Sequence, residues 1–303
     1  MIPMGTAPIF IGGLARSGKT LLRQLLSSHP NILMTRRTYI WRHFFDRFGN
    51  LAEEKNFERC LSAMMQRESI RLLMPEPDRI RREFWQSDEQ TYARLFSLLH
   101  EHYAQRLGKT RWGEQEGSIE QYAAQIFGAY PNARMIHMIR DPRSLYSDEV
   151  KLPSRKRLGK VGSITGEWVT SLRFAEKNLE RFRDKYKLVR IEDLLNQPEE
   201  TMSETSDFIN EDVSQIKLIL DGAGDKISAE NDETMGWTKE RVHEYLSISE
   251  VVSPEDLVFI ENYAGEWMLE HGYLKAAKPM SLNQYVLYYF RLPANFMRLK
   301  KVF

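Results

Sequence analysis

A short glycine-rich stretch near the N-terminus carries the residue types that bind anions. Gly13, Gly18, Lys19 and Thr20 occur in the order Gly-x-x-x-x-Gly-Lys-Thr, soon after the apolar run Ile9–Ile11. The apolar run predicts a buried β-strand, and the leucines that follow Thr20 at helical spacing predict an amphipathic helix. A loop between a strand and a helix N-terminus offers backbone N–H groups and the positive end of the helix dipole. We therefore predict a phosphate or sulfate site in this loop.

Two further positions inside the loop add groups that bind anions. Arg16 contributes a positive charge and Ser17 a hydroxyl, between the two glycines of the motif. The arrangement matches the phosphate loop of nucleotide-binding proteins, whose Lys contacts the β- and γ-phosphates and whose Thr holds Mg²⁺. One hypothesis is therefore a kinase or NTPase that uses ATP and Mg²⁺, with Asp141 after a later strand as a second carboxylate for the metal.

A second cluster of charged and hydroxyl residues follows another apolar run. Arg140 comes directly after Ala133–Ile139, which predicts a strand, and Pro142 is well placed to begin a helix. Ser147 and Asp148 lie seven and eight positions after Arg140. Ligands of parallel α/β sheets bind at the carboxyl ends of the strands, so we expect Arg140 on the same edge of the sheet as the first loop.

The order of these motifs resembles that of the sulfotransferases. The Arg-Ser-Gly of residues 16–18, followed by an aliphatic helix and by a His-Pro-Asn-Ile segment, resembles the phosphosulfate loop of that family. Three later segments resemble further family motifs and follow in the family's order: Met135–Lys151, Leu188–Ile209 and Ser253–Tyr273. Together the four segments cover most of the chain between the first strand and residue 273.

The resemblance implies a sulfate donor and a set of residues that bind it. The donor implied is 3′-phosphoadenosine-5′-phosphosulfate (PAPS), with adenosine 3′,5′-bisphosphate as the product. The first loop would bind the phosphosulfate, and the second motif would bind the 3′-phosphate. The residues implied are Arg16, Ser17, Gly18, Lys19, Thr20 and Leu21 in the first segment, and Arg140 with Ser147 or Asp148 in the second.

The chain departs from the family pattern at several positions. Lys19 stands where the family usually has Thr, and Leu21 where cytosolic members have an aromatic residue that stacks on adenine. Asp148 occupies the position of the serine that contacts the 3′-phosphate, and Gln115 replaces a usual Lys. These departures leave the expected fold unchanged and leave the identity of the catalytic base open.

The reaction implied is in-line transfer of a sulfuryl group to a hydroxyl or amine. Negative charge develops on the leaving phosphate oxygen, and Arg16 and Lys19 are the catalytic cations that we expect there. The acceptor must lose a proton to a general base. Glu114, at the end of a predicted strand, is the first candidate for this base, ahead of Glu116 and His43. Cations of the protein can neutralise the leaving group, so no metal site is predicted.

Strands separated by helices, without hairpin signals, predict an α/β fold with a P-loop-like central parallel sheet flanked by helices. We expect a single domain over residues 1–303. Residues from about 39 to 108 have a helical pattern, and we interpret them as a cap insertion over the ligand cleft, where a small-molecule, sugar or peptide acceptor binds. Residues from about 275 to 303 are expected to form a C-terminal helical tail, and Asn31–Arg42 an irregular segment.

The composition argues against several classes of protein. A net charge of +1 provides no field that would attract nucleic acid. The single Cys60 excludes an internal disulfide. There is no apolar run long enough to span a membrane and no room for a signal peptide ahead of the first strand, so we expect no transmembrane segment and a cytoplasmic protein. A non-catalytic nucleotide-binding protein of the same fold is a third hypothesis, which the altered base region favours.

Overall fold

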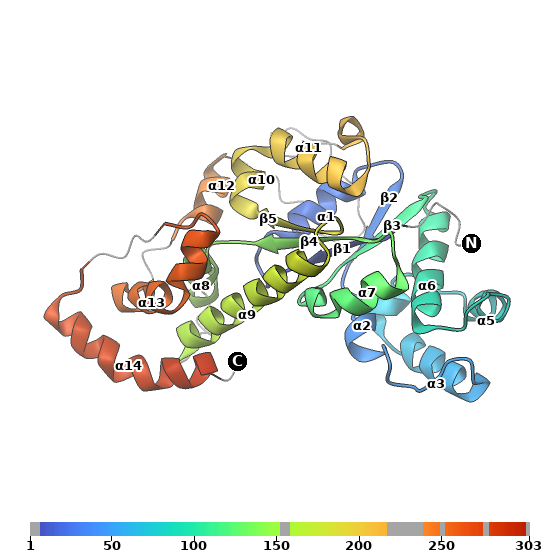
Figure 1. Cartoon of the computed structure of the whole chain (residues 1–303), viewed down its shortest axis with the longest axis horizontal. Coiled ribbons are helices and arrows are strands. Elements are labelled where there is room, and N and C mark those ends of the chain that lie inside the picture. The colour runs from blue at the N-terminus through green and yellow to red at the C-terminus, as the bar shows by residue number, and fades with distance from the viewer. Residues whose placement is uncertain (1–6, 152–157, 217–238, 249–251, 275–278, 301–303) are drawn as a thin grey trace.

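The computed structural model describes residues 7–151, 158–216, 239–248, 252–274 and 279–300. Its centre is a five-stranded sheet in the order β2-β3-β1-β4-β5, in which every neighbouring pair is parallel (Figure 1). The strands are β1 (Ile9–Gly12), β2 (Ile32–Thr35), β3 (Arg111–Gln115), β4 (Arg134–Ile139) and β5 (Tyr186–Arg190). The predicted parallel sheet with flanking helices is therefore confirmed.

One strand was missed by the sequence analysis. The expectation that Asn31–Arg42 is irregular is wrong for Ile32–Thr35, which forms β2 and pairs with β3 from Ile32↔Arg111 to Thr35↔Glu114. All four residues of β2 are buried. A four-residue apolar segment carries too short a pattern to be recognised by itself, and its pairing with a strand far along the chain decides its conformation.

The strand order brings the predicted site elements together. β1 lies between β3 and β4, so the chain leaves the carboxyl ends of these three adjacent strands at the same edge of the sheet. The loop after β1, the residues at the end of β3 and Arg140 after β4 therefore meet at this edge, as expected for a ligand site of a parallel sheet.

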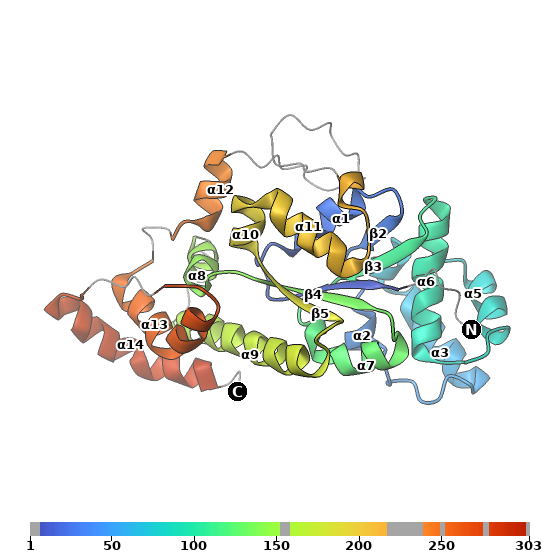
Figure 2. The same ribbon diagram turned by 45° about the horizontal axis from the view of Figure 1, so that its top comes forward.

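Helices cover both faces of the sheet (Figure 2). On one face, apolar side chains of the strands form a core with α1 (Lys19–Ser27), α10 (Ile191–Asn196) and α11 (Pro198–Ile209). On the other face, α9 (Lys160–Arg181) runs beneath the sheet, together with a helical block that lies between β2 and β3.

This helical block shares one hydrophobic core with the sheet. Aromatic side chains of β1, α2 and β3 meet there, with ring centroids of Phe10 6.4 Å from Trp41 and 5.8 Å from Trp112. The block packs on a face of the sheet, and its role in covering an acceptor stays a prediction. Its helices, with the two that follow β3, are α2 (Ile40–His43), α3 (Glu54–Met65), α4 (Glu68–Arg71), α5 (Pro77–Trp85), α6 (Tyr92–Arg106), η1 (Ile119–Tyr122) and α7 (Ala123–Ala129).

The C-terminal part adds helices beside the end of the sheet where β4 and β5 lie. They are α8 (Pro142–Val150), α12 (Lys239–Leu246), α13 (Pro254–Glu270) and α14 (Leu282–Lys300), and a short η3 (Val213–Gln215) follows α11. A third hydrophobic cluster joins α8, α13 and α14 to α9, whereas side chains of α12 pack against the core that α1 forms with the sheet. Residues 275–278 and 301–303 of the predicted tail lie outside the described residues. No helix in the described part of the chain is long and apolar enough to cross a membrane.

Candidate functional site

The loop after β1 has a backbone path that requires its two motif glycines. Gly13 and Gly18 have φ angles of +110° and +89°, in the region that side chains disfavour. A Cβ atom on Gly13 would lie 2.2 Å from the carbonyl oxygen of Met138, and one on Gly18 would lie 2.3 Å from Cδ1 of Ile191. The spacing of the motif thus reflects both the turn and the close approach of the loop to β4 and α10.

The loop leads into a helix N-terminus that carries no side-chain cap. Gly18 is the N-cap residue of α1, and no side chain accepts a hydrogen bond from the first turn in the part of the chain that the structure describes. The first turn also contains no acidic residue. Ser17 is buried, and its hydroxyl donates to the carbonyl oxygen of Leu14, 2.8 Å away. The positive end of α1 is therefore open to an anion.

Lys19 is folded back against the loop. Its ammonium donates to the carbonyl oxygen of Gly13 at 2.8 Å and to that of Leu14, and its side chain is buried. The pKa of Lys19 is lowered to about 8, mainly by burial; the carboxylate of Glu120 opposes this shift, and the charge of Arg37 contributes to it. Lys19 is thus a cation that an anion in the loop would help to keep charged.

The remaining loop residues differ in exposure. Arg16 is partly exposed, has a φ of +65°, and its side chain pairs with Glu149 of α8 at 3.3 Å. Thr20 is exposed at the start of α1. Leu21 is buried in the core that α1 forms with the sheet, so its side chain does not lie at the surface of the loop.

A buried carboxylate supports the loop from behind. Glu120, in η1, accepts a hydrogen bond from the backbone N–H of Gly13 at 3.1 Å and another from Ser171 at 3.3 Å. His137 of β4 lies 2.9 Å from the Ser171 hydroxyl through Nε2 and 2.6 Å from the Tyr186 hydroxyl through Nδ1. His137 is therefore a hydrogen-bonded core residue, and the network links β4 and α9 to the loop.

Arg140 lies beside the loop, as predicted, and is completely buried. Its guanidinium donates to the backbone carbonyl of Arg16 at 3.1 Å, so the two anion-binding motifs are in direct contact. It also donates to the carbonyl of Tyr245 in α12, and the ring of Tyr245 stacks 3.6 Å from the guanidinium carbon. The Tyr245 hydroxyl donates to the Arg16 carbonyl at 2.5 Å, which ties α12 to the loop.

The guanidinium of Arg140 is paired with the carboxylate of Asp148. One terminal nitrogen of Arg140 donates to Oδ2 of Asp148 at 2.7 Å. Ser147 is buried on the preceding position of α8. Arg140 Nε has no partner among the described residues, which leaves one buried donor of the guanidinium for a ligand. The residues fit a nucleotide with a phosphate at this position, and Asp148 opposes its charge.

The carboxylate that the kinase hypothesis requires is already engaged. Asp141 is the N-cap residue of α8 and accepts from the backbone N–H of Arg143 at 2.8 Å. Its other oxygen accepts from the Arg143 guanidinium at 2.7 Å. The side chain is thus used to begin α8 and to hold an arginine that also pairs with Glu261. These contacts disfavour Asp141 as a metal ligand.

Two buried glutamates lie at the carboxyl end of β3. Glu114 accepts from the backbone N–H of Thr38 at 2.6 Å and also from its hydroxyl, and it has no exposed surface. Burial raises the pKa of Glu114, and burial together with the Glu114 charge raises the pKa of Glu116. One oxygen of each carboxylate has no hydrogen-bond partner in the described structure. The third base candidate, His43, is partly buried in α2.

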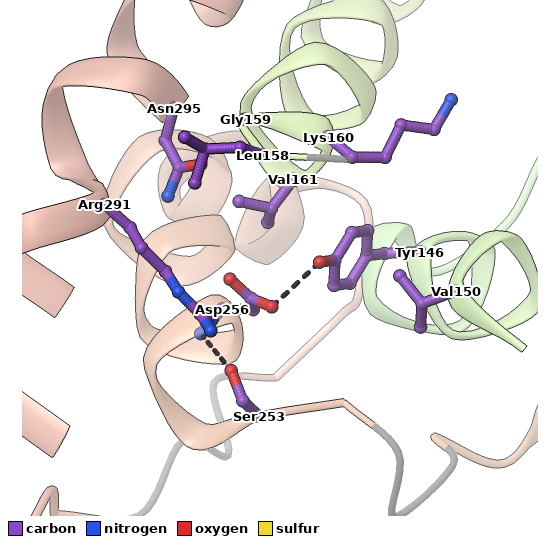
Figure 3. Close-up of a pocket in the computed structure, with 10 residues that line it drawn as sticks. All are labelled: Tyr146, Val150, Leu158, Gly159, Lys160, Val161, Ser253, Asp256, Arg291 and Asn295. Atoms are coloured by element: carbon purple, nitrogen blue, oxygen red, sulfur yellow. Dashed lines mark hydrogen bonds between the residues drawn. The ribbon is translucent and has the colours of Figure 1, made fainter. Parts of the chain in front are cut away.

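A separate cavity of about 350 Å³ lies between α8, α9, α13 and α14 (Figure 3). Tyr146 and Asp256 face each other across it and form a hydrogen bond of 2.8 Å. Lys160 on its rim pairs with Glu149, the partner of Arg16. No described residue of the phosphate loop lines the cavity, so we do not assign the donor to it.

Several site residues could not be recognised in the sequence. Glu120 contacts the loop, Ser171 contacts Glu120 and Tyr245 contacts Arg140, but all three lie in segments with an ordinary helical pattern. Thr38 holds Glu114 from an extended segment before α2. None of these four residues belongs to a motif, and their sequence distance from the loop gave no signal.

The comparisons with known proteins agree with this geometry. A family model described as "Sulfotransferase family" matches residues 8–215. No curated protein matches the chain. The sulfotransferase domain of the Synechococcus PCC 7002 olefin synthase is 20% identical, with a TM-score of 0.51 over 87% of this chain and 98% of that domain. The sulfotransferase STF9 of Mycobacterium avium is 15% identical, with a TM-score of 0.46 over 90% of this chain and 79% of its own. Because the family model spans well over half of its length, this chain belongs to the sulfotransferase family.

Proposed function

We propose that this enzyme transfers a sulfuryl group from PAPS to a hydroxyl or amine of its acceptor. The observation that carries the proposal is the contact between Arg140 and the backbone of Arg16, which joins a helix N-terminus without a cap to a second buried cation. Two phosphate-binding groups that meet in this way suit a nucleotide with phosphates at both its 5′ and 3′ positions. When bound, the donor supplies an activated sulfuryl group attached to a phosphate oxygen.

In this proposal Lys19 and Arg16 stabilise the charge that appears on the leaving phosphate oxygen. Lys19 is buried, so its ammonium acts in surroundings where water screens little. Arg16 is more exposed, but Glu149 restricts the movement of its guanidinium. Arg140 binds the 3′-phosphate, and Glu120 keeps the loop in place by accepting the N–H of Gly13. We place Gly18, Ser17 and Thr20 around the 5′-phosphosulfate.

The proton of the acceptor is taken by the glutamate pair at the end of β3. The raised pKa values of Glu114 and Glu116 favour at most one charge on the pair near neutral pH, which suits proton exchange with an acceptor. Glu114 accepts from Thr38 with Oε1, and His100 Nε2 lies 3.9 Å from its Oε2. We propose that Oε2 of Glu114 or Oε2 of Glu116 takes the proton, since neither has a hydrogen-bond partner in the described structure. Comparing Glu114→Gln with Glu116→Gln should identify which glutamate is the base. Only the substitution of the base should lower turnover while leaving donor binding unchanged.

Ligand binding in the absence of an acceptor tests the donor. We expect adenosine 3′,5′-bisphosphate to raise the melting temperature in EDTA, and ATP with Mg²⁺ to have little effect. Isothermal titration with the bisphosphate, AMP and ATP then gives the contribution of each phosphate. Tight binding of ATP that depends on Mg²⁺, without a response to the bisphosphate, would replace this proposal by the kinase hypothesis.

The acceptor itself is tested once the donor binds. The helical block between β2 and β3 reaches the glutamate pair through Thr38, so we propose that its α2 end lines the acceptor site. Small alcohols, sugars and tyrosine peptides can be compared by release of the bisphosphate from PAPS. The non-catalytic hypothesis would be supported if the protein binds the bisphosphate but neither sulfates any acceptor nor hydrolyses PAPS slowly.

A further inference from the structure

The C-terminal helix α14 is attached to the body of the protein by one narrow face. Tyr288, Asn295 and Leu299 are its buried residues. The start of α9 approaches it closely: a Cβ atom on Gly162 would lie 1.9 Å from the carbonyl oxygen of Asn295. Figure 1 and Figure 2 both show α14 at the periphery, beyond α13 and α9. The helix is therefore positioned by contacts that leave its opposite side uncovered.

The outer face of α14 is apolar. At 100° per residue, its most exposed apolar side chains fall within an arc of about 100° on the side away from α9. They are Leu282 (80% exposed), Val286 (65%), Tyr289 (65%), Phe290 (78%) and Met297 (64%). Isolated exposed apolar residues are ordinary, but a continuous stripe along one helix marks an interaction surface.

The charged residues of the C-terminal segment that contains α14 all have one sign. From Pro279 to Phe303 the sequence contains no Asp or Glu and four basic residues. Arg298 and Lys300 lie in the last turn of α14, and the Lys300 ammonium is 4.6 Å from the ring of Phe296. The basic end of the helix thus lies directly beside its apolar stripe.

We propose that the outer face of α14 binds the surface of an anionic membrane. A helix with an apolar face, aromatic side chains and basic residues without acidic ones lies in the headgroup region, with the apolar side chains reaching the acyl chains. Anionic lipid headgroups would pair with Arg298 and Lys300. The tyrosines suit this depth, since their rings are apolar and their hydroxyls remain in contact with water. This inference concerns where the enzyme acts and does not depend on the donor or acceptor.

Vesicle co-sedimentation of the full-length protein tests the proposal. We expect the protein to sediment with vesicles that contain phosphatidylglycerol, with a partition coefficient about tenfold above that for phosphatidylcholine alone. The double variant Val286→Glu/Phe290→Glu places two acids in the stripe and should reduce sedimentation at least tenfold. Arg298→Gln/Lys300→Gln keeps the stripe and should remove the preference for the anionic lipid.

Leu72→Glu is the matched control, because Leu72 is a similarly exposed leucine (64%) in the helical block at the other end of the molecule. It should sediment like the parent protein. Circular dichroism verifies that each variant folds. If Val286→Glu/Phe290→Glu does not fold, Arg298→Gln/Lys300→Gln tests the proposal through the loss of the preference for anionic lipid. Absence of sedimentation of the parent protein would overturn the proposal. A second outcome would also overturn it: the parent protein does not bind vesicles, light scattering shows a dimer, and Val286→Glu/Phe290→Glu is a monomer. A second copy of the chain would then cover the stripe.

Discussion

The candidate donor site has two halves, the loop after β1 and the region around Arg140, and they differ in how many of their cationic groups already have a partner within the protein. At the first loop, the N-terminus of α1 has no side-chain cap and no acidic residue, and Lys19 is buried beside it. At the start of α8, the guanidinium of Arg140 already has a carboxylate partner in Asp148. The first half therefore offers positive potential to any anion, whereas a ligand at the second half has one unpaired donor, Arg140 Nε, and meets the carboxylate of Asp148.

Because of this difference, we expect the two halves to contribute differently to donor binding: the loop to the affinity for the donor, and Arg140 with Asp148 to the selectivity for a 3′-phosphate. An anion at the loop gains from the helix dipole and from a cation that burial makes costly to leave unpaired. A phosphate at Arg140 gains a charged hydrogen bond but meets the repulsion of Asp148. We therefore expect the loop to provide most of the binding and catalysis, and Arg140 with Asp148 to decide how strongly a 3′-phosphate is preferred.

The largest effect is expected at Lys19. Lys19→Thr, which restores the family pattern, should lower turnover about 10²–10³-fold and leave bisphosphate affinity within a few-fold, because the ammonium stabilises charge that forms only in the transition state. Slow hydrolysis of PAPS without an acceptor is the measurement. Lys109→Thr removes another partly buried lysine, which donates to the carbonyl of His29, and should change hydrolysis little. Equal rates for Lys19→Thr and the parent protein would exclude the catalytic role.

Arg140→Ala should distinguish the two halves by ligand. Loss of a buried guanidinium–phosphate contact should weaken bisphosphate binding about 100-fold, whereas AMP, which lacks the 3′-phosphate, should change less than about twofold. Titration calorimetry with both ligands gives the comparison, and AMP serves as the internal control for folding. If both ligands weaken equally, Arg140 supports the loop through the Arg16 carbonyl and does not select the 3′-phosphate.

Asp148→Ser should make the Arg140 half of the site resemble the loop, in that its cation would no longer have an internal carboxylate partner. Removing the carboxylate frees the guanidinium and removes a like charge, so bisphosphate affinity should rise about tenfold while AMP affinity stays constant. Glu204→Ser, which removes an exposed partner of Lys187 on α11, is the control for a change of net charge. A fall in bisphosphate affinity with Asp148→Ser would show that the carboxylate positions Arg140 for its ligand.

The smallest effect is a pH dependence that belongs to the first half alone. The pKa of Lys19 is lowered to about 8 in the free protein by burial, and a bound anion raises it, so binding takes up a proton above that pH. Because the Lys19 charge contributes only a few-fold to bisphosphate binding, affinity should be greatest below the pKa and fall less than about twofold from about pH 7.5 to about pH 8.5. Lys19→Thr should abolish this fall, as measured by calorimetry. The ligand's own phosphates are already ionised in this range.

The comparison also shows which parts of the site were accessible from the sequence. The glycines of the loop were predictable, because the positive φ angles of Gly13 and Gly18 are local demands that leave a local pattern. Arg140 was predictable as a residue that follows a strand and precedes a proline at a helix start. From the sequence alone, Asp141 could have been a metal ligand. In the structure its carboxylate caps α8 and pairs with the guanidinium of Arg143.

Sequence by itself determined the parallel α/β fold and the positions of the anion-binding motifs, because both depend on short patterns of apolar residues, glycine and charge. The tertiary structure alone decided that Ile32–Thr35 is a strand, that Glu120 holds Gly13, and that Tyr245 covers Arg140. Each of these is a contact between segments far apart in the chain, and it forms because the packed sheet brings their backbones together. A side chain whose partner lies more than a hundred positions away, as for Glu120 and Gly13, leaves no periodic trace in its own neighbourhood.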